Sequence, residues 1–343
     1  MNSRRWELGA RMAAALLAVF LLAACAPRLA PGGPGLSSED PAPGFTQGAL
    51  VTDDGLRLPA RRWVPEGKIK LLILALHGFN DYSNAFEETG RYLAEQGILT
   101  VAYDQRGFGE APHRGRWAGV GAMTADLNTA ARSLGESHPG LPLILLGESM
   151  GGAVILAALT SEDPPPAKSI VLSAAAVWGR KTMPWYQRAA LWLGAHTVPW
   201  GNVSGRGLKI QASDNIEMLR ALGRDPLVIK ETRVDAVYGL ANLMDAALAS
   251  APDVRLPALL LYGENDEIIP MEPTLEFWRD LPRTDGVAQR MALYDTGWHM
   301  LLRDLRADIV LADIAHWVQA PDLPLPSGAD RRAEETLAAD ARP

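Results

Sequence analysis

The chain has 343 residues, a formal net charge of −7 at pH 7 and 48% apolar side chains. The acidic balance argues against nucleic acid as a partner and against a polybasic membrane patch. An apolar share of this size over this length can form a sizeable core, so we expect one large domain with an insertion, or two smaller domains.

Residues 1–24 have the pattern of an export signal and should not belong to the fold. Arginines at positions 4, 5 and 11 precede an apolar run, 12–24, that is too short to span a bilayer comfortably. The run ends in Leu22-Ala23-Ala24-Cys25, which resembles the lipobox of bacterial lipoproteins, where the cysteine is diacylated and becomes the new N-terminus. We therefore expect a lipid anchor at Cys25; an ordinary signal peptide with an incidental cysteine is the alternative. Cys25 is the only cysteine, so no internal disulfide can form.

The two ends of the mature chain should lie outside the folded domain. Residues 25–44 are rich in Pro, Gly, Ala and Ser without apolar periodicity, which predicts a disordered tether that holds the domain off a membrane. Ala26 would be the second mature residue, and in the sorting rule known for such lipoproteins a non-Asp residue there implies the outer membrane. We thus expect a lipid-anchored protein of the bacterial cell envelope that faces the periplasm. Residues 319–343 predict a loose C-terminal tail that can hold one frayed helix.

Between these ends, over residues 45–318, strand and helix patterns alternate. Residues 49–52 and 57–63 predict an antiparallel pair around an Asp-Asp-Gly turn. Continuously apolar strands are expected at 70–76, 98–103, 143–146, 169–172, 258–262 and 290–294, and helices at 83–96, 122–136, 153–159 and 301–318. Strands that are apolar throughout are buried on both faces, so we predict an α/β fold with a mainly parallel sheet and helices on each side.

One stretch, from about residue 174 to 255, contains no predicted strand. Most of its large apolar side chains should be core residues; they are Trp178, Trp185, Trp192, Trp200, Met183, Met218 and Met244. A helical insertion above the carboxyl ends of a parallel sheet covers the place where such sheets bind ligands. We therefore predict a cap with an apolar inner face that forms an acyl pocket.

The motif Gly147-Glu148-Ser149-Met150-Gly151 lies between a predicted strand and a predicted helix. This setting is typical of a nucleophile elbow, in which a strained backbone exposes the serine hydroxyl and the flanking glycines permit a tight turn. The first N–H groups of the new helix point to where an oxyanion would form. The motif therefore predicts that Ser149 is a nucleophile, against the alternative of an ordinary Gly-rich turn.

A serine nucleophile needs a base and an orienting acid, which in this arrangement follow in the order Ser, Asp or Glu, His. Asp266 follows the strand at 258–262, and His299 follows the strand at 290–294, so both are expected at the same sheet edge as Ser149. Spacing alone leaves Glu264 and Glu267 open as the acid. The other five histidines lie in positions more typical of structural or solvated side chains.

Two backbone donors should form the oxyanion hole. One is the N–H of Met150, the residue after the nucleophile. The second comes from the loop after the first long central strand, His77-Gly78-Phe79-Asn80-Asp81, where Phe79 is the expected donor and His77 shapes the loop.

These motifs, together with 104–109 (Asp-Gln-Arg-Gly-Phe-Gly) and 224–228 (Arg-Asp-Pro-Leu-Val), resemble the α/β-hydrolases over about residues 45–318. The nearest branch is the bacterial monoacylglycerol lipase and lysophospholipase group, often labelled serine aminopeptidase-like. The resemblance implies an α/β-hydrolase fold, the triad Ser149, Asp266 and His299, and structural roles for Asp104 and Arg106. The sequence departs from monoglyceride lipases at Asp81-Tyr82, where an acid and then a histidine are usual, and at Glu110, which replaces a Ser.

Three functions follow, and none requires a cofactor. The first is a serine hydrolase of lipid or lysolipid esters, supported by the triad order, the apolar cap and the lipid anchor. The second is an aminopeptidase or amidase on the same triad, which would need a carboxylate pair in the cap, where Asp214, Glu217, Asp235 and Asp245 lie. The third is a non-catalytic lipoprotein, against which the intact triad argues. No His/Cys cluster indicates a metal, and no Gly-rich phosphate loop indicates a nucleotide.

Overall fold

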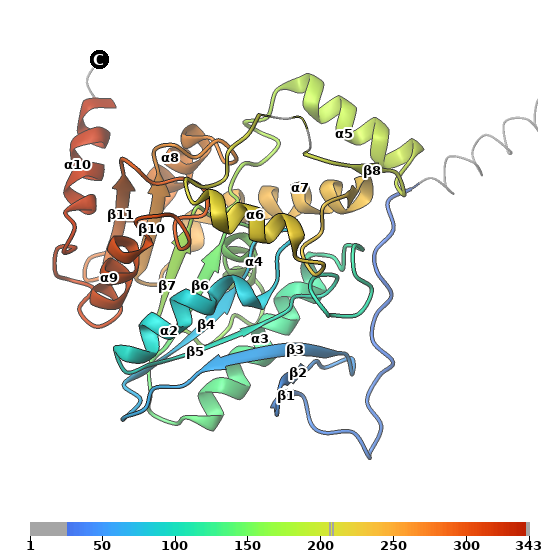
Figure 1. Ribbon diagram of the computed structural model, residues 1–343, viewed down its shortest axis with the longest axis horizontal. Coiled ribbons are helices and arrows are strands. Elements are labelled where there is room, and N and C mark those ends of the chain that lie inside the picture. The colour runs from blue at the N-terminus through green and yellow to red at the C-terminus, as the bar shows by residue number, and fades with distance from the viewer. Residues whose placement is uncertain (1–25, 206, 208, 341–343) are drawn as a thin grey trace, which may run out of the picture.

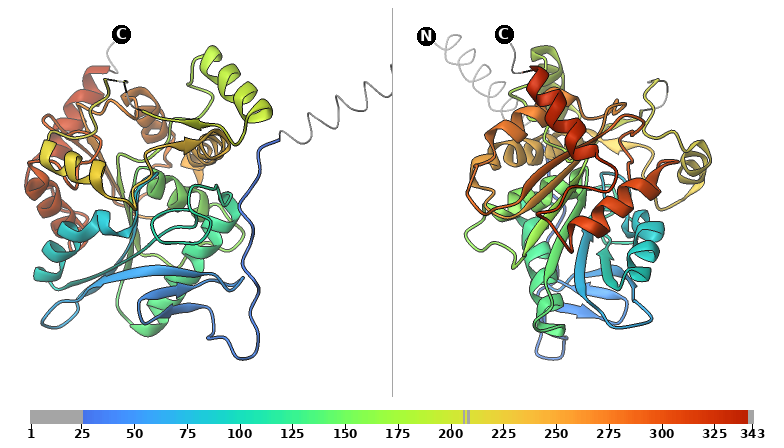
Figure 2. Two further views of the ribbon diagram at one scale, coloured as in Figure 1. Left: turned by 45° about the vertical axis from the view of Figure 1, so that its right-hand side comes forward. Right: turned by 90° about the vertical axis from the view of Figure 1, so that its left-hand side faces the viewer.

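The computed structural model describes residues 26–205, 207 and 209–340. In this part of the chain a nine-stranded sheet lies between two layers of helices (Figures 1 and 2). The strand order is β1-β2-β3-β5-β4-β6-β7-β10-β11. Pairing is antiparallel from β1 through β3 to β5 and parallel among β5, β4, β6, β7, β10 and β11. The predicted mainly parallel α/β sheet is confirmed.

The strands of this sheet are β1 (Gly44–Thr46), β2 (Ala49–Val51), β3 (Arg57–Trp63), β4 (Leu71–Leu76), β5 (Ile98–Tyr103), β6 (Leu143–Glu148), β7 (Ser169–Ser173), β10 (Ala258–Gly263) and β11 (Gln289–Tyr294). The helices are η1 (Ser83–Phe86), α2 (Glu87–Glu95), α3 (Val120–Ser137), α4 (Met150–Leu159), α5 (Trp185–Thr197), α6 (Ile216–Arg224), α7 (Val234–Ala249), η2 (Ala251–Asp253), α8 (Met271–Asp280), α9 (Ala307–Trp317) and α10 (Ala329–Asp340).

Alternation along the central strands separates two hydrophobic cores. In β4 the side chains of Leu72, Leu74 and Leu76 join the core that also holds residues of α3, α4, α7 and α8. Ile73 and Ala75 of the same strand face the other core, with residues of α2 and α9. Successive side chains of a strand point to opposite faces, so a strand without polar residues can be buried on both faces. Burying each Leu side chain contributes about 1.5–3 kcal/mol to the free energy of folding.

The insertion between β7 and β10 forms the predicted cap, with α5, α6 and α7 at the carboxyl edge of the sheet (Figure 1). The expectation that it contains no strand is wrong, because β8 (Asn202–Val203) pairs with β9 (Thr232–Arg233) inside it. The helix predicted over 301–318 begins only at Ala307. Two N–H groups before this helix are bonded to the cap instead, that of Met300 to Ala212 O at 3.0 Å and that of Leu305 to Asp214 Oδ1 at 2.8 Å.

The N-terminal segment was expected to be a disordered tether, and its described part instead follows a defined path along the domain. The N–H of Ala30 donates to Trp117 O at 2.7 Å. Those of Gly33 and Gly35 donate to the Asp54 carboxylate and carbonyl, at 2.7 and 2.8 Å. These bonds hold a sequence that has no apolar pattern of its own. Cys25 and the expected signal, 1–24, lie outside the described residues.

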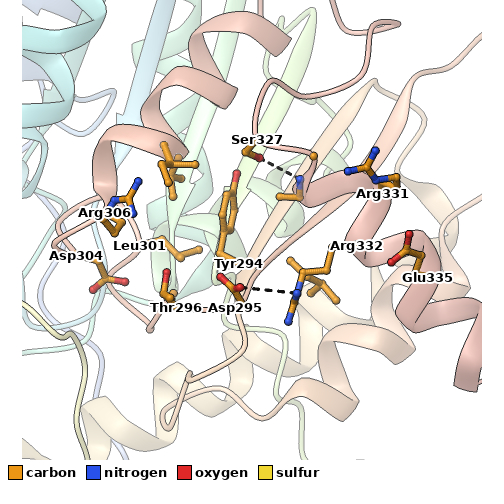
Figure 3. Close-up of a pocket in the computed structure, with 16 residues that line it drawn as sticks. Tyr294, Asp295, Thr296, Leu301, Asp304, Arg306, Ser327, Arg331, Arg332 and Glu335 are labelled. Carbon is orange, nitrogen blue, oxygen red and sulfur yellow. Dashed lines mark hydrogen bonds and ion pairs between the residues drawn. The ribbon is translucent and has the colours of Figure 1, made fainter.

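The tail also differs from the expectation of a loose segment. Its helix α10 packs against β11, with Ala333 buried in the core. Arg290 of β11 pairs with the buried Asp330 at 2.5 Å, and Arg332 pairs with Glu264 at 2.6 Å. Figure 3 shows the cavity of about 360 Å³ that α9, α10 and the loop after β11 enclose. In the described residues no helix is long and apolar enough to cross a bilayer.

Candidate active site

The predicted nucleophile lies at a sharp turn between β6 and α4. Ser149 is the residue between the two elements, with φ 50° and ψ −113°, in the region that L-residues rarely adopt. Its N–H donates to Ser173 O at 2.9 Å, and its carbonyl accepts from the N–H of Ala176 at 3.0 Å. The surrounding structure thus holds the strained conformation that a nucleophile elbow requires.

The glycines of the motif are required by close backbone contacts. A Cβ at Gly151 would lie 2.0 Å from Leu76 O, and one at Gly147 would lie 2.4 Å from the N of Gly152. Neither position therefore admits a side chain. Gly78, in the loop after β4, faces the elbow, since a Cβ there would lie 3.5 Å from the Ser149 Cβ. The expected oxyanion loop is thus adjacent to the expected nucleophile.

The structure brings Asp266 and His299 together. His299 Nδ1 lies 2.8 Å from Asp266 Oδ2, and the Asp266 side chain is fully buried. The other carboxylate oxygen accepts the N–H groups of Ile268 and Ile269 at 2.7 and 2.9 Å, which fixes the carboxylate. Since the strands before Ser149, Asp266 and His299 are parallel, all three residues lie at the same sheet edge.

The two alternative acids, Glu264 and Glu267, bind partners other than His299. Glu264 binds Arg332 of α10, and Glu267 accepts the N–H of Gln211 at 2.7 Å. Of the acids that spacing left open, Asp266 is the one whose carboxylate contacts His299. Among the described residues, no group of three or more His, Cys, Asp and Glu side chains is arranged to hold a metal ion.

His77 stabilises the expected oxyanion loop through two hydrogen bonds. Its Nε2 accepts the N–H of Gln105 at 3.0 Å, so the proton is on Nδ1, which donates to Gly78 O at 2.8 Å. Burial lowers the pKa of His77 and favours this neutral form. The Phe79 ring packs on Phe108, and Met150 begins α4 beside the elbow. Of the two predicted oxyanion donors, Phe79 therefore lies in the loop that meets the elbow, and Met150 follows Ser149 as the first residue of α4.

A buried ion-pair network that the sequence analysis missed joins three loops of the candidate active site. Arg303, four residues after His299, lies 2.8 Å from Asp81 of the oxyanion loop and 3.2 Å from Glu148 of the elbow motif. Burial opposes the charge of Arg303, but the two carboxylates more than offset this and raise its pKa above the ordinary value. One side chain thereby sets the relative positions of the elbow, the oxyanion loop and the histidine loop.

The cap residues 225–232 are hydrogen-bonded to the expected oxyanion loop, the loop that follows β4. Asn80 donates to Thr232 Oγ1 at 2.7 Å, and its carbonyl accepts the N–H of Ile229 at 2.9 Å. The Tyr82 hydroxyl donates to Asp225 at 2.8 Å. Tyr82 is one of the positions where the sequence departs from the family pattern, and here its hydroxyl bonds the loop to the cap.

An earlier part of the cap, residues 212–215, is hydrogen-bonded to the histidine loop, the loop after β11 that contains His299. The Asp304 carboxylate accepts from Ser213 Oγ at 2.5 Å and from the N–H of Trp298 at 2.8 Å. Asn215 donates to the carbonyl of Arg303 at 3.0 Å. Burial raises the pKa of Asp304. Residues 212–232 therefore connect both loops on which the chemistry would depend.

The prediction that most large apolar cap residues are core is wrong for three tryptophans. Trp185 is 77% exposed, Trp192 56% and Trp200 55%, whereas Met244 is buried and Trp178 packs against the core. Since α5 buries only Ala195, its tryptophans point away from the domain. They do not form the predicted inner face of the cap.

The fold is that of the α/β-hydrolases. The monoacylglycerol lipase of Paleococcus ferrophilus superimposes with a TM-score of 0.64 at 20% identity, over 77% of this chain and 99% of that chain. A soluble variant of monoglyceride lipase from Saccharomyces cerevisiae, in complex with a substrate analog, gives a TM-score of 0.66 at 20% identity, over 85% and 99%.

The chain belongs to the family described as "Serine aminopeptidase, S33", whose sequence profile matches residues 67–306. Monoglyceride lipase of Rattus norvegicus is 26% identical over 275 residues, 78% of this chain and 89% of the relative. Monoacylglycerol lipase of Mycolicibacterium smegmatis is 24% identical over 272 residues, 77% and 93%. These findings confirm the resemblance drawn from the motifs, and the protein is a hydrolase.

Proposed function

We propose that the protein is a carboxylic ester hydrolase that acts on monoacylglycerol- or lysophospholipid-like esters through an acyl-enzyme intermediate. Ser149 Oγ attacks the ester carbonyl while His299 takes its proton, and the N–H groups of Phe79 and Met150 stabilise the oxyanion. His299 then protonates the leaving alcohol, and water hydrolyses the acyl-enzyme by the same route. The contact between Asp266 and His299 carries this proposal, because it orients the base.

The charges of the cap favour an ester over a peptide. An aminopeptidase needs carboxylates that bind a free amino group. Asp214 accepts the N–H of Leu305, Asp235 binds Arg233, and Asp245 binds Arg180. Glu217 pairs with Arg220 in an exposed helical pair. The cap acids singled out for a peptidase are therefore engaged with their own neighbours, and the relatives named above are lipases.

A Ser149→Ala variant tests the mechanism. Because a triad acts as a unit, we expect hydrolysis of p-nitrophenyl butyrate to fall on the order of 10⁴-fold or more without unfolding. A fluorophosphonate probe should label the wild type and a Ser161→Ala control just after the C-terminal end of α4, and should not label Ser149→Ala. Activity retained in Ser149→Ala would contradict the assignment.

A substrate series tests the class of ester. Each methylene buried in an acyl site contributes ~0.8 kcal/mol, so kcat/KM should rise as the acyl chain lengthens from acetate. Monoacylglycerols, lysophospholipids and aminoacyl anilides are compared on the same enzyme. Faster turnover of an anilide than of any ester would favour the peptidase.

We also propose that Cys25 carries a lipid and that the protein is held at the outer membrane, facing the periplasm. The support is the Leu-Ala-Ala-Cys sequence that follows the apolar run and precedes Ala26. Cys25→Ser should move the protein out of the membrane fraction or leave the signal uncleaved. A variant that fractionates as the wild type does would contradict the anchor.

A further inference from the structure

Residues 26–35, which we call the strap, are attached to the domain mainly through backbone hydrogen bonds. No residue of this range is buried, and the Leu29 side chain is 64% exposed. The strap nevertheless follows one edge of the domain and passes the loop between β5 and α3 (Figures 1 and 2). Segments with few buried apolar contacts open at a low cost in free energy. The strap should therefore detach from the domain more readily than any strand or helix of the core.

Two bonds of the strap lead to the loop between β5 and α3, and they reach it near opposite ends. The N–H of Ala30 donates to the carbonyl of Trp117 at 2.7 Å. The N–H of Gly33 donates to Asp54 Oδ2 at 2.7 Å, and both oxygens of the Asp54 carboxylate accept from the buried Arg106, each at 2.7 Å. The Arg106 guanidinium holds the pKa of the Asp54 carboxyl well below its ordinary value, so Asp54 stays ionised as an acceptor. The strap is thus bonded directly to one end of the loop and through Asp54 to the other.

The loop between β5 and α3 also contacts the expected oxyanion loop. Gln105 donates to His77 twice, from its N–H to the ring Nε2 at 3.0 Å and from its side-chain Nε2 to the carbonyl at 2.8 Å. The Phe79 ring contacts those of Phe108 and Trp117, with ring centroids 5.5 and 6.3 Å apart. The loop that holds the strap therefore also holds the residue whose N–H is an expected oxyanion donor.

Trp117 combines three of these contacts in one residue. Its side chain is buried, and it lies so close to α7 of the cap that a Cβ at Gly239 would be 2.2 Å from its ring. Its carbonyl accepts from the strap, and its ring packs on Phe79. Because the interior of a protein is close-packed, such a ring cannot shift without moving its neighbours. A displacement of the Trp117 backbone should therefore displace Phe79.

We propose that the strap positions the oxyanion loop, and that Trp117 is the positioning residue through which it acts on Phe79. The proposal rests on the hydrolase function proposed above. A donor N–H stabilises an oxyanion only while it points to the place where the charge forms, and a displacement of about 1 Å can cost much of the rate. Because the oxyanion is absent from the bound ester, release of the strap should lower kcat and leave KM nearly unchanged. The N-terminal segment thereby controls the rate of hydrolysis from outside the site.

Two neighbouring glycines of the strap provide a matched pair of variants. A Cβ at Gly33 would lie 2.2 Å from the carbonyl oxygen of Asp54, whereas a Cβ at Gly32 would make an ordinary contact, 3.5 Å from the Asp54 carboxylate. Ala30→Pro removes the N–H that binds Trp117. The double variant Ala30→Pro/Gly33→Ala should therefore release the strap, and Gly32→Ala should leave it in place.

The full-length proteins are compared by their kinetics with p-nitrophenyl butyrate and by hydrogen exchange. In the double variant kcat should fall at least about threefold with KM within about twofold, and residues 77–82 should exchange faster; Gly32→Ala should match the wild type in both. Wild-type kcat in the double variant, or unchanged exchange of residues 77–82, would overturn the proposal. A fall in kcat that accompanies a large loss of thermal stability would show that the strap only stabilises the fold, and would also overturn it. If the wild type hydrolyses no ester, the exchange data still test the coupling and only the proposed function fails.

Trp117→Phe tests the positioning residue by itself. The variant keeps an aromatic ring and the carbonyl that binds the strap, but the smaller ring leaves the contact with Phe79 incomplete. We expect kcat to fall several-fold while residues 26–35 keep the hydrogen exchange of the wild type. Wild-type kcat in this variant would overturn the role of Trp117.

Discussion

The two parts of the cap differ in how they are held. Residues 212–232 are hydrogen-bonded to the loops around the candidate active site, through pairs such as Ser213–Asp304 and Tyr82–Asp225. Helix α5 buries only Ala195 and points its aromatic side chains to solvent. Hydrogen bonds between buried or half-buried groups fix positions, whereas an exposed apolar helix is held by little packing. The first part should therefore control the chemistry, and the second should control contact with other surfaces.

Substitution of Arg303, which contacts the elbow and the oxyanion loop from the histidine loop, should cause the largest loss of stability and of kcat. Arg303→Met leaves the buried Asp81 and Glu148 without their cation, which should lower the free energy of unfolding by about 3–5 kcal/mol. Displaced loops should lower kcat for a soluble ester by about 10²-fold, with KM changed much less. Unfolding curves and steady-state kinetics measure both quantities.

Arg303→Lys is the matched variant in case Arg303→Met fails to fold. It keeps the charge but cannot contact both carboxylates with one planar group, so kcat should lie between the wild type and Arg303→Met. Wild-type kcat in either folded variant would show that the network is not needed to position the loops.

A smaller effect is expected at the bond between the oxyanion loop and the cap. Tyr82→Phe removes the donor to Asp225 and leaves the ring in place, which should cost about 1 kcal/mol of stability. The loop that carries Phe79 would be held less firmly, so kcat should fall several-fold. Tyr92→Phe, on α2, is the control. If Tyr82→Phe and the control behave alike, the cap does not position this loop.

The smallest effect is expected on α5. Trp192→Ala should change the free energy of unfolding by no more than about 0.5 kcal/mol, because the ring is exposed and stacks only on His196 within the same helix. Turnover of soluble esters should stay within about twofold of the wild type. A large loss with short soluble esters would contradict the division of the cap into two parts.

Local sequence was sufficient to predict the sheet and the elbow. Continuous apolar runs such as residues 71–76 are compatible with strands buried on both faces, and this pattern needs no distant partner to be recognised. The glycines at 147 and 151 are required by contacts of the turn itself and of the strand beside it. The order of Ser149, Asp266 and His299 follows from the parallel strands that precede them. The sequence thus determined the fold class, the candidate nucleophile and the candidate base, and it confined the acid to one short loop.

Only the tertiary structure distinguished Asp266 from Glu264 and Glu267, because all three share one short loop and differ in the partners that distant elements present. The Arg303 network joins residues 155 positions apart, and such a pair has no local pattern. The contacts of the N-terminal segment and of α10, and the exposure of the α5 tryptophans, were not predicted for the same reason. Composition describes what a segment could bury, but burial is decided by the surface that the rest of the chain places against it.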